Sequence, residues 1–249
     1  MFSFSPNEIE QFEESGYFFP ITVLSGDEVK VCRDSLERFE ASQGGSLNSS
    51  QRHKAHLLFK WLDNLIRDPR ILDPVEQLIG PDILCWNTLF WIKDSHSKSF
   101  VSWHQDTRYW GLSSDKVLSV WLALSPASEE SGCMRVMPGT HRGEVLPHDD
   151  RYHEDNMLTR GQEITRGVKE TEAVLMPWNR DRFPSTTTAS PMLQDRITRG
   201  TGVSVFRCIS CRRIPNRLSV TGTVPRWFGE RTDRGTSNPL RSRKRILIR

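Results

Sequence analysis

A chain of 249 residues is long enough for one large domain with its own hydrophobic core, or for a domain with an appended segment. Its 36% hydrophobic and 26% charged residues are typical of a soluble globular protein. The chain lacks a run of about 18 apolar residues, and its N-terminus lacks a basic stretch followed by an apolar core. We therefore expect neither a membrane span nor a secretory signal.

The cysteines are odd in number and scattered along the chain. Without an export signal, such thiols are expected to stay reduced in a cytosol, so we predict a cytoplasmic protein. The five residues are Cys32, Cys85, Cys133, Cys208 and Cys211.

The net charge of +3 is divided unevenly along the chain. Residues 1–177 hold 18 basic and 27 acidic residues, a balance of −9, whereas residues 178–249 hold 16 and 4, a balance of +12. Of those 16 basic residues, 15 are arginine and only Lys244 is lysine. This change of composition predicts a folded domain over residues 1–177 and a basic tail over residues 178–249.

The N-terminal third of the chain carries helix signals. Ser5 precedes a proline and an early acidic residue, as at a helix N-cap, and Gly16 is placed to end that helix. "YFFPITVL" then reads as a short strand. Ser25 opens a second helix that runs to about Ser42. Two further amphipathic helical stretches follow at residues 56–68 and 70–80.

From Asp82 onward, the apolar residues recur with a period of about two, which is typical of strands. Helices followed by short strands predict a mainly β fold, in which an antiparallel barrel or double-sheet core carries N-terminal helices. The strand candidates are residues 83–93, 99–110, 117–126, 132–141 and 172–177.

After Pro177, neither period is sustained, and arginine, serine, threonine, glycine and proline dominate. "VSVFRCIS" at residues 203–210 reads as one isolated strand. We expect residues 178–249 to be largely disordered or poorly packed.

The fragment "WHQD" contains the most informative pair of residues. Because residues i and i+2 of a strand point to the same face, His104 and Asp106 can aim an imidazole and a carboxylate at one point. A second histidine would complete a 2-His-1-carboxylate iron site. A lone pair of this kind also occurs by chance, as a histidine that happens to lie near an aspartate.

The surrounding sequence favours the iron site. "WNTLFWIKDSHSKSFVSWHQDTRYWGL" and "VLSVWLALSPASEESGCMRVMPGTHRG" resemble the phytanoyl-CoA dioxygenase family of Fe(II)- and 2-oxoglutarate-dependent oxygenases. The resemblance covers roughly residues 5–177. It implies a double-stranded β-helix, or jelly roll, which in this chain is incomplete at the C-terminal end.

The resemblance also implies the site. His104 and Asp106 would be catalytic residues and ligands of Fe(II), while Trp121 and Asn87 would contact the co-substrate 2-oxoglutarate. The family couples oxidative decarboxylation of 2-oxoglutarate to hydroxylation of an unactivated C–H bond by O2. The expected partner is a small organic or acyl substrate, and neither its identity nor the oligomeric state is readable from the sequence.

Other readings of the same residues stay open. Trp121 is also a candidate for simple core packing, and His141 in "PGTH" is better explained as a structural hydrogen-bonding residue than as a ligand. Trp103, Tyr109 and Trp110 are candidates for a substrate pocket or for the core.

The third ligand is missing. None of the seven histidines follows His153, whereas the resemblance implies a second histidine late in the barrel and an arginine about ten residues beyond it. That arginine would pair with the distal carboxylate of 2-oxoglutarate. The chain as written is therefore either an inactive pseudoenzyme of the family or an altered copy of an active one.

A shift of reading frame near residues 177–179 explains the loss. Reading the codons of residues 180–203 one nucleotide earlier, with permitted third bases, yields "PGPISLHHHRLAHAPGPNHARDRR". The restored ligand straddles Pro191 and Met192, and the restored arginines fall around Gly202 and Val203. This hypothesis requires the codons of Thr186, Thr187 and Pro191 to end in C.

A rival function of a different class is binding of nucleic acid or another anionic surface by the basic tail. Its net charge of +12 and its residues Phe206, Trp227 and Phe228 favour this reading. No helix or known motif organises the charge, so we do not expect a nucleic-acid partner.

Overall fold

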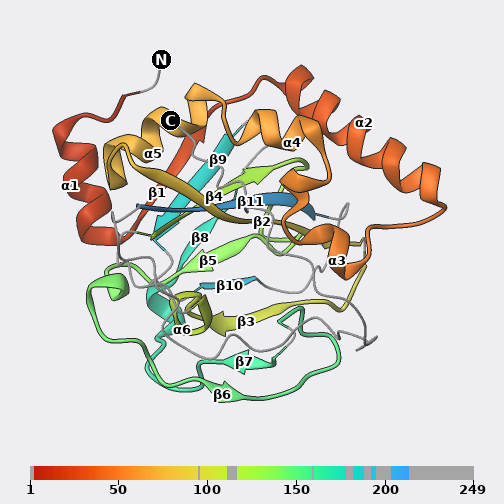
Figure 1. Ribbon diagram of the computed structural model, residues 1–249. Helices are drawn as coiled ribbons and strands as arrows, with labels where there is room; N and C mark the ends of the chain where they lie inside the picture. The colour runs from red at the N-terminus through yellow and green to blue at the C-terminus, as the bar shows by residue number, and fades with distance from the viewer. Residues whose placement is uncertain are drawn as a thin grey trace, which may run out of the picture.

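The computed structural model describes residues 3–94, 96–110, 117–158 and 160–177, together with the backbone of residues 182–187, 192–194 and 203–212. It has three layers, in which the N-terminal helices cover a five-stranded sheet that packs on a four-stranded sheet (Figure 1). A short hairpin lies at the side of the four-stranded sheet that faces away from the helices (Figure 1).

The helices are short apart from α2, and three single 3-10 turns interrupt the loops. The α-helices are α1 (Pro6–Ser15), α2 (Gly26–Gln43), α3 (Ser49–Arg52), α4 (Lys60–Leu65), α5 (Pro69–Ile79) and α6 (Thr107–Trp110). The 3-10 turns are η1 (Ala55–Leu57), η2 (Thr140–Arg142) and η3 (Glu170–Glu172).

Every strand pairing within the sheets is antiparallel. The five-stranded sheet has the order β1-β9-β4-β11-β2, the four-stranded sheet the order β3-β10-β5-β8, and β6 pairs with β7. The strands are β1 (Tyr17–Thr22), β2 (Ile83–Lys93), β3 (Val101–His104), β4 (Val117–Ala123), β5 (Met134–Val136), β6 (Asp149–Asp150), β7 (Gln162–Glu163), β8 (Val174–Met176), β9 (Arg182–Thr187), β10 (Met192–Gln194) and β11 (Val203–Arg212).

The predicted ends of the first two helices are confirmed. Ser5 and Ser25 each accept a hydrogen bond from the backbone N–H three residues later, and the carboxylate of the glutamate at that position accepts one from the backbone N–H of the cap residue. Gly16 ends α1 with a φ of 78°, in the left-handed region that glycine adopts without strain. His141 lies against Gly16 and hydrogen-bonds through Nε2 to the carbonyl of Glu13 at 3.0 Å, which confirms its structural role.

The alternation of side chains along β2 and β4 separates two cores. On β2, Phe90 belongs to the core beneath the helices, whereas Leu89 and Trp91 belong to the core between the sheets. On β4, Leu122 faces the helices and Trp121 faces the second sheet. The double-sheet core with N-terminal helices is therefore present, as the period of two predicted, but the fold as a whole mixes helix and strand and is not mainly β.

Three expectations differ from the structure. The stretch at residues 56–68 is split into η1 and α4 rather than forming one helix. The strand at residues 203–210 does not stand alone, because β11 lies between β2 and β4. β9 and β10, which lie within the residues expected to be poorly packed, also join the sheets, and these pairings are long-range contacts that a local period does not reveal. The boundary at Pro177 stays a prediction, and residues 213–249 lie outside the described residues.

No helix in the described part of the chain is long and apolar enough to cross a membrane. Within that part, Cys32, Cys85 and Cys133 form no disulfide.

An ion pair between α2 and α5 gives a pH-dependent contribution to stability. Arg70 makes two hydrogen bonds to the carboxylate of Glu28, at 2.9 and 3.1 Å, and these bonds are the main cause that lowers the pKa of Glu28 to about 2. Because its pKa is lower in the folded chain, Glu28 stabilises the fold above its unfolded pKa near 4.5, and the contribution is lost as the pH falls towards 2.

We expect Glu28→Gln to lower the free energy of unfolding at pH 7 by about 0.5–1 kcal/mol, since the pair is nearly half exposed. The difference from the parent chain is expected to shrink as the pH is lowered from 5 to 3, in urea titrations followed by circular dichroism. Glu10→Gln, at an α1 residue without an ion pair among the described residues, is the control. A difference that stays constant across this pH range would contradict the assignment.

Candidate metal centre

His104 is the last residue of β3 and is only 3% exposed. Its Nδ1 lies 2.8 Å from the carbonyl oxygen of Ser102, which can only accept, so Nδ1 carries the proton and donates it. In the neutral form of the ring, the other nitrogen, Nε2, presents a lone pair. This Nε2 atom is buried without a hydrogen-bond partner and lies 3.4 Å from Oδ1 of Asp106.

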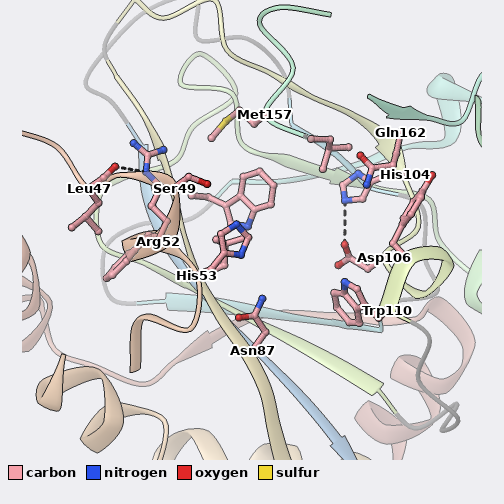
Figure 2. A pocket seen from close by; sticks show the side chains of 15 residues that line it. Leu47, Ser49, Arg52, His53, Asn87, His104, Asp106, Trp110, Met157 and Gln162 are labelled. Atoms are coloured by element: carbon pink, nitrogen blue, oxygen red, sulfur yellow. Dashed lines mark hydrogen bonds and ion pairs between the residues drawn. The ribbon is translucent and has the colours of Figure 1, made fainter. Parts of the chain in front are cut away.

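Asp106 does not lie on a strand, which corrects the premise that the two side chains converge through strand alternation. β3 ends at His104, and the chain turns at once into α6. The carbonyls of Gln105 and Asp106 accept hydrogen bonds from the backbone N–H groups of Arg108 and Tyr109, at 3.3 and 3.0 Å. The turn brings the carboxylate back towards the imidazole, so the side chains still meet (Figure 2).

The loop before β6 holds the segment between the two candidate ligands. The backbone N–H of Gln105 donates to Nε2 of His148 at 2.9 Å, and the Gln105 side-chain oxygen accepts from the backbone N–H of Leu146 at 2.7 Å. His148 in turn donates from Nδ1 to the carbonyl of Leu146 at 2.8 Å. Burial lowers the pKa of His148, which keeps it in the neutral form that this network needs. Nothing in the local sequence pattern pointed to this role of His148.

These contacts fit a metal ion. A neutral imidazole and a carboxylate turn lone pairs towards one another at 3.4 Å, which is unfavourable unless a proton or a cation lies between them. A hydrogen bond from Nδ1–H to a backbone carbonyl, as here, is the usual contact that orients a metal-binding histidine. Among the described residues, however, no group of three His, Cys, Asp or Glu side chains could hold a metal.

The candidate ligands lie at one end of a cavity of about 390 Å³. Figure 2 shows His104, Asp106, Trp110 and Gln162 at this end, and Leu47, Ser49 and Arg52 at the other. The lining also includes the apolar residues Leu89, Trp91, Met157 and Leu158. The volume and the mixed apolar and polar lining suit a small molecule.

The remaining predicted residues divide into two groups. The cavity lining includes Asn87, Tyr109 and Trp110, each of which was a candidate from the sequence for a ligand pocket. Trp121 does not line it but stacks behind Trp91, with ring centroids 6.2 Å apart. Trp103 packs instead in a separate buried cluster, because it alternates away from the cavity face of β3. Contacts of Asn87 and Trp121 with a co-substrate stay predictions.

The sequence patterns did not predict that Arg52 and His53 line the cavity. They lie about fifty residues before His104, on a short helix and loop that only the tertiary fold brings to β2.

The backbone of β10 bears on the missing ligand. Met192 is the direct partner of His104 across the antiparallel ladder, and on its other side it pairs with Val136. Residues directly opposite one another in such a ladder share a face of the sheet. Position 192, where the shifted reading frame encodes histidine, is therefore adjacent to the candidate centre. Of the other positions named for restored residues, Pro191 and Gly202 lie outside the described residues, whereas Val203 is the first residue of β11.

Comparison with known proteins identifies the relatives of this chain. The family model for phytanoyl-CoA dioxygenase (PhyH) matches residues 12–180. A probable alpha-ketoglutarate-dependent hypophosphite dioxygenase from Stutzerimonas stutzeri is 31% identical over 112 residues, which cover 45% of this chain and 39% of that protein. The chain thus spans well under two thirds of the length of this curated relative.

Solved structures show the same fold. The non-heme monooxygenase ThoJ in its apo form has a TM-score of 0.71 and 29% identity, over 82% of this chain and 76% of that one. EctD from S. alaskensis with bound Fe has a TM-score of 0.68 over 87% of this chain and 79% of that one, and its 15% identity supports similarity of fold alone.

Proposed function

Because the chain belongs to the phytanoyl-CoA dioxygenase family, a family of 2-oxoglutarate-dependent dioxygenases, we propose that its fold serves hydroxylation of a small organic or acyl substrate. In this reaction R–H, 2-oxoglutarate and O2 give R–OH, succinate and CO2. The observation that carries the proposal is the meeting of His104 Nε2 and Asp106 Oδ1 at 3.4 Å, both buried at the end of the cavity. Related structures contain iron or 2-oxoglutarate, which supports the same cofactors here.

His104 and Asp106 would hold Fe(II), and the metal would supply the activation of O2. Gln105, fixed by Leu146 and His148, keeps the two ligands at their mutual distance. Asn87, on the cavity wall, would contact 2-oxoglutarate, and Trp121 would act by backing Trp91. Burial raises the pKa of Tyr109 to about 12, so its hydroxyl stays protonated and can donate a hydrogen bond to a bound ligand.

The two antiparallel sheets support a jelly roll that is incomplete at its C-terminal end. Residues 1–177 would then form the oxygenase domain, with residues 178–249 as a segment whose sequence was changed by the shift of frame.

A second candidate is an inactive pseudoenzyme. It is favoured by one observation, the lack of a third ligand among the described residues and of any histidine after His153. With two protein ligands, metal binding is expected to be weak, and without the arginine the co-substrate loses its anchor.

The proposal is tested by titrating the purified chain with Co(II), a spectroscopically visible substitute for Fe(II). We expect His104→Ala and Asp106→Ala each to weaken Co(II) binding at least about tenfold, since even contacts behind the ligands are worth that much. His53→Ala is the matched control, because His53 lines the same cavity but is not a proposed ligand. Equal loss in the His53 variant, or none in the other two, would place the metal elsewhere.

A further inference from the structure

The end of the cavity opposite the candidate metal centre contains an arginine with little to bind it. Arg52, the last residue of α3, is half-buried and lines the cavity (Figure 2). Its Nε–H donates to the carbonyl of Leu47 at 3.0 Å. No carboxylate of the described residues forms an ion pair with it, and this bond leaves its two terminal NH2 groups available.

Several contacts fix this arginine in place. Asn48 and Gln51 form a reciprocal capping box around α3, with bonds of 3.0 and 2.9 Å. Directly after Arg52, the backbone N–H of Lys54 donates to the carbonyl of Thr88 at 2.7 Å and to the side-chain oxygen of Asn87 at 3.2 Å. The guanidinium is therefore carried on a segment anchored to β2, which favours binding a ligand in one orientation.

The guanidinium of Arg52 is available to an anion from outside the chain. Among the described residues, Asp106 is the only carboxylate in the cavity lining, and it lies at the opposite end, beside His104 (Figure 2). A guanidinium offers two parallel N–H donors that match a carboxylate, a phosphonate or a similar oxyanion. Between the two ends, Figure 2 shows Met157 together with the polar side chains of His53 and Asn87, and the lining also includes Trp91.

This position differs from the one expected for the distal carboxylate of 2-oxoglutarate. The arginine that the shifted frame restores falls around Val203, and Val203 pairs with Lys93 at the far end of β2. Lys54, two residues after Arg52, is instead hydrogen-bonded to Asn87, six residues before Lys93 on β2. Because Asn87 is the residue predicted to contact 2-oxoglutarate, the co-substrate is the alternative ligand of Arg52, and the experiment below separates the two.

We propose that Arg52 anchors the anionic group of the organic substrate, so that the enzyme takes small organic acids with a short apolar body. The acid group would bind at Arg52, the apolar part along Trp91 and Met157, and the reacting C–H bond would lie near His104 and Asp106. This inference rests on the proposed function for the reaction, but the binding that it predicts needs no metal and no turnover.

The test uses pentanoate and its neutral analogue pentanamide as probes of the purified 249-residue chain. Binding is followed by quenching of tryptophan fluorescence, to which Trp91 and Trp110 in the cavity wall contribute, and is checked by ligand-observed NMR. We expect the parent chain to bind pentanoate more tightly than pentanamide. Arg52→Gln is expected to weaken pentanoate binding about tenfold or more while leaving pentanamide binding unchanged.

Two further variants separate charge, geometry and folding. Arg52→Lys keeps the charge without the planar fork, so an intermediate loss is expected. Arg38→Gln is the control, because Arg38 is exposed on α2 and also lacks an ion pair among the described residues. Circular dichroism melts show whether each variant is folded.

Three outcomes would overturn the inference. In the first, the parent chain binds pentanoate no more tightly than pentanamide. In the second, Arg52→Gln is folded and binds pentanoate as tightly as the parent chain does. In the third, Arg52→Gln loses as much affinity for 2-oxoglutarate as for pentanoate. The last result would assign Arg52 to the co-substrate. Failure of the Co(II) titration would instead reject the metal centre and leave the result for pentanoate unaffected.

Discussion

Met192→His is expected to increase the affinity of the chain for Co(II) by about tenfold to a hundredfold, the range that metal-site contacts command. The physical reason is the register of β10, which places position 192 directly across from His104. A second imidazole on that face would turn two ligands into the three of a facial 2-His-1-carboxylate site. Titration with Co(II), followed by its visible absorption, measures the gain.

Leu193→His is the matched control for this experiment. It adds the same side chain one residue along β10, where strand alternation places it on the opposite face of the sheet. An equal gain in both variants would indicate adventitious binding to histidine. If Met192→His does not increase the affinity for Co(II), position 192 is not the place of the missing ligand.

The frame-restored chain is expected to convert 2-oxoglutarate to succinate at least about a thousandfold faster than the chain as written, because groups that act as a unit fail together when one is lost. Restoration supplies both the third ligand and the arginine for the distal carboxylate of 2-oxoglutarate. Succinate release under O2 with added Fe(II) measures the rate for each chain, and sequencing of the codons across Pro177 precedes the experiment.

The control is the frame-restored chain with Asp106→Ala, which is expected to lose turnover. If the 249-residue chain forms succinate as fast as the frame-restored chain, then it has not lost function and a second histidine is not needed. Codons of Thr186, Thr187 or Pro191 that do not end in C would reject the frame hypothesis itself.

Local sequence signals predicted the parts of the fold that depend on neighbours in the chain. The caps at Ser5 and Ser25 and the glycine at position 16 are satisfied within one helical turn, so their residue types suffice to predict them. The alternation along β2 and β4 reflects burial on two faces, which each strand records in its own residues. The pair His104–Asp106 was found in the same way, although the reason given for its convergence was wrong.

The features that the sequence did not reveal depend on contacts between distant segments. The isolated strand at residues 203–210 is in fact paired on both sides, because β2 and β4 provide partners that no local period records. The clamp on Gln105 comes from His148, forty-three residues later in the chain.

By itself, the sequence determined the family, the candidate ligands and the absence of a histidine after His153, because each is a matter of residue type and spacing. Only the tertiary structure decided that a turn brings Asp106 to His104, that Met192 lies opposite the candidate centre, and that Arg52 enters the cavity wall. The physical reason is that strand register and helix docking are set by burial and hydrogen bonding over the whole chain, and not by any short stretch of it.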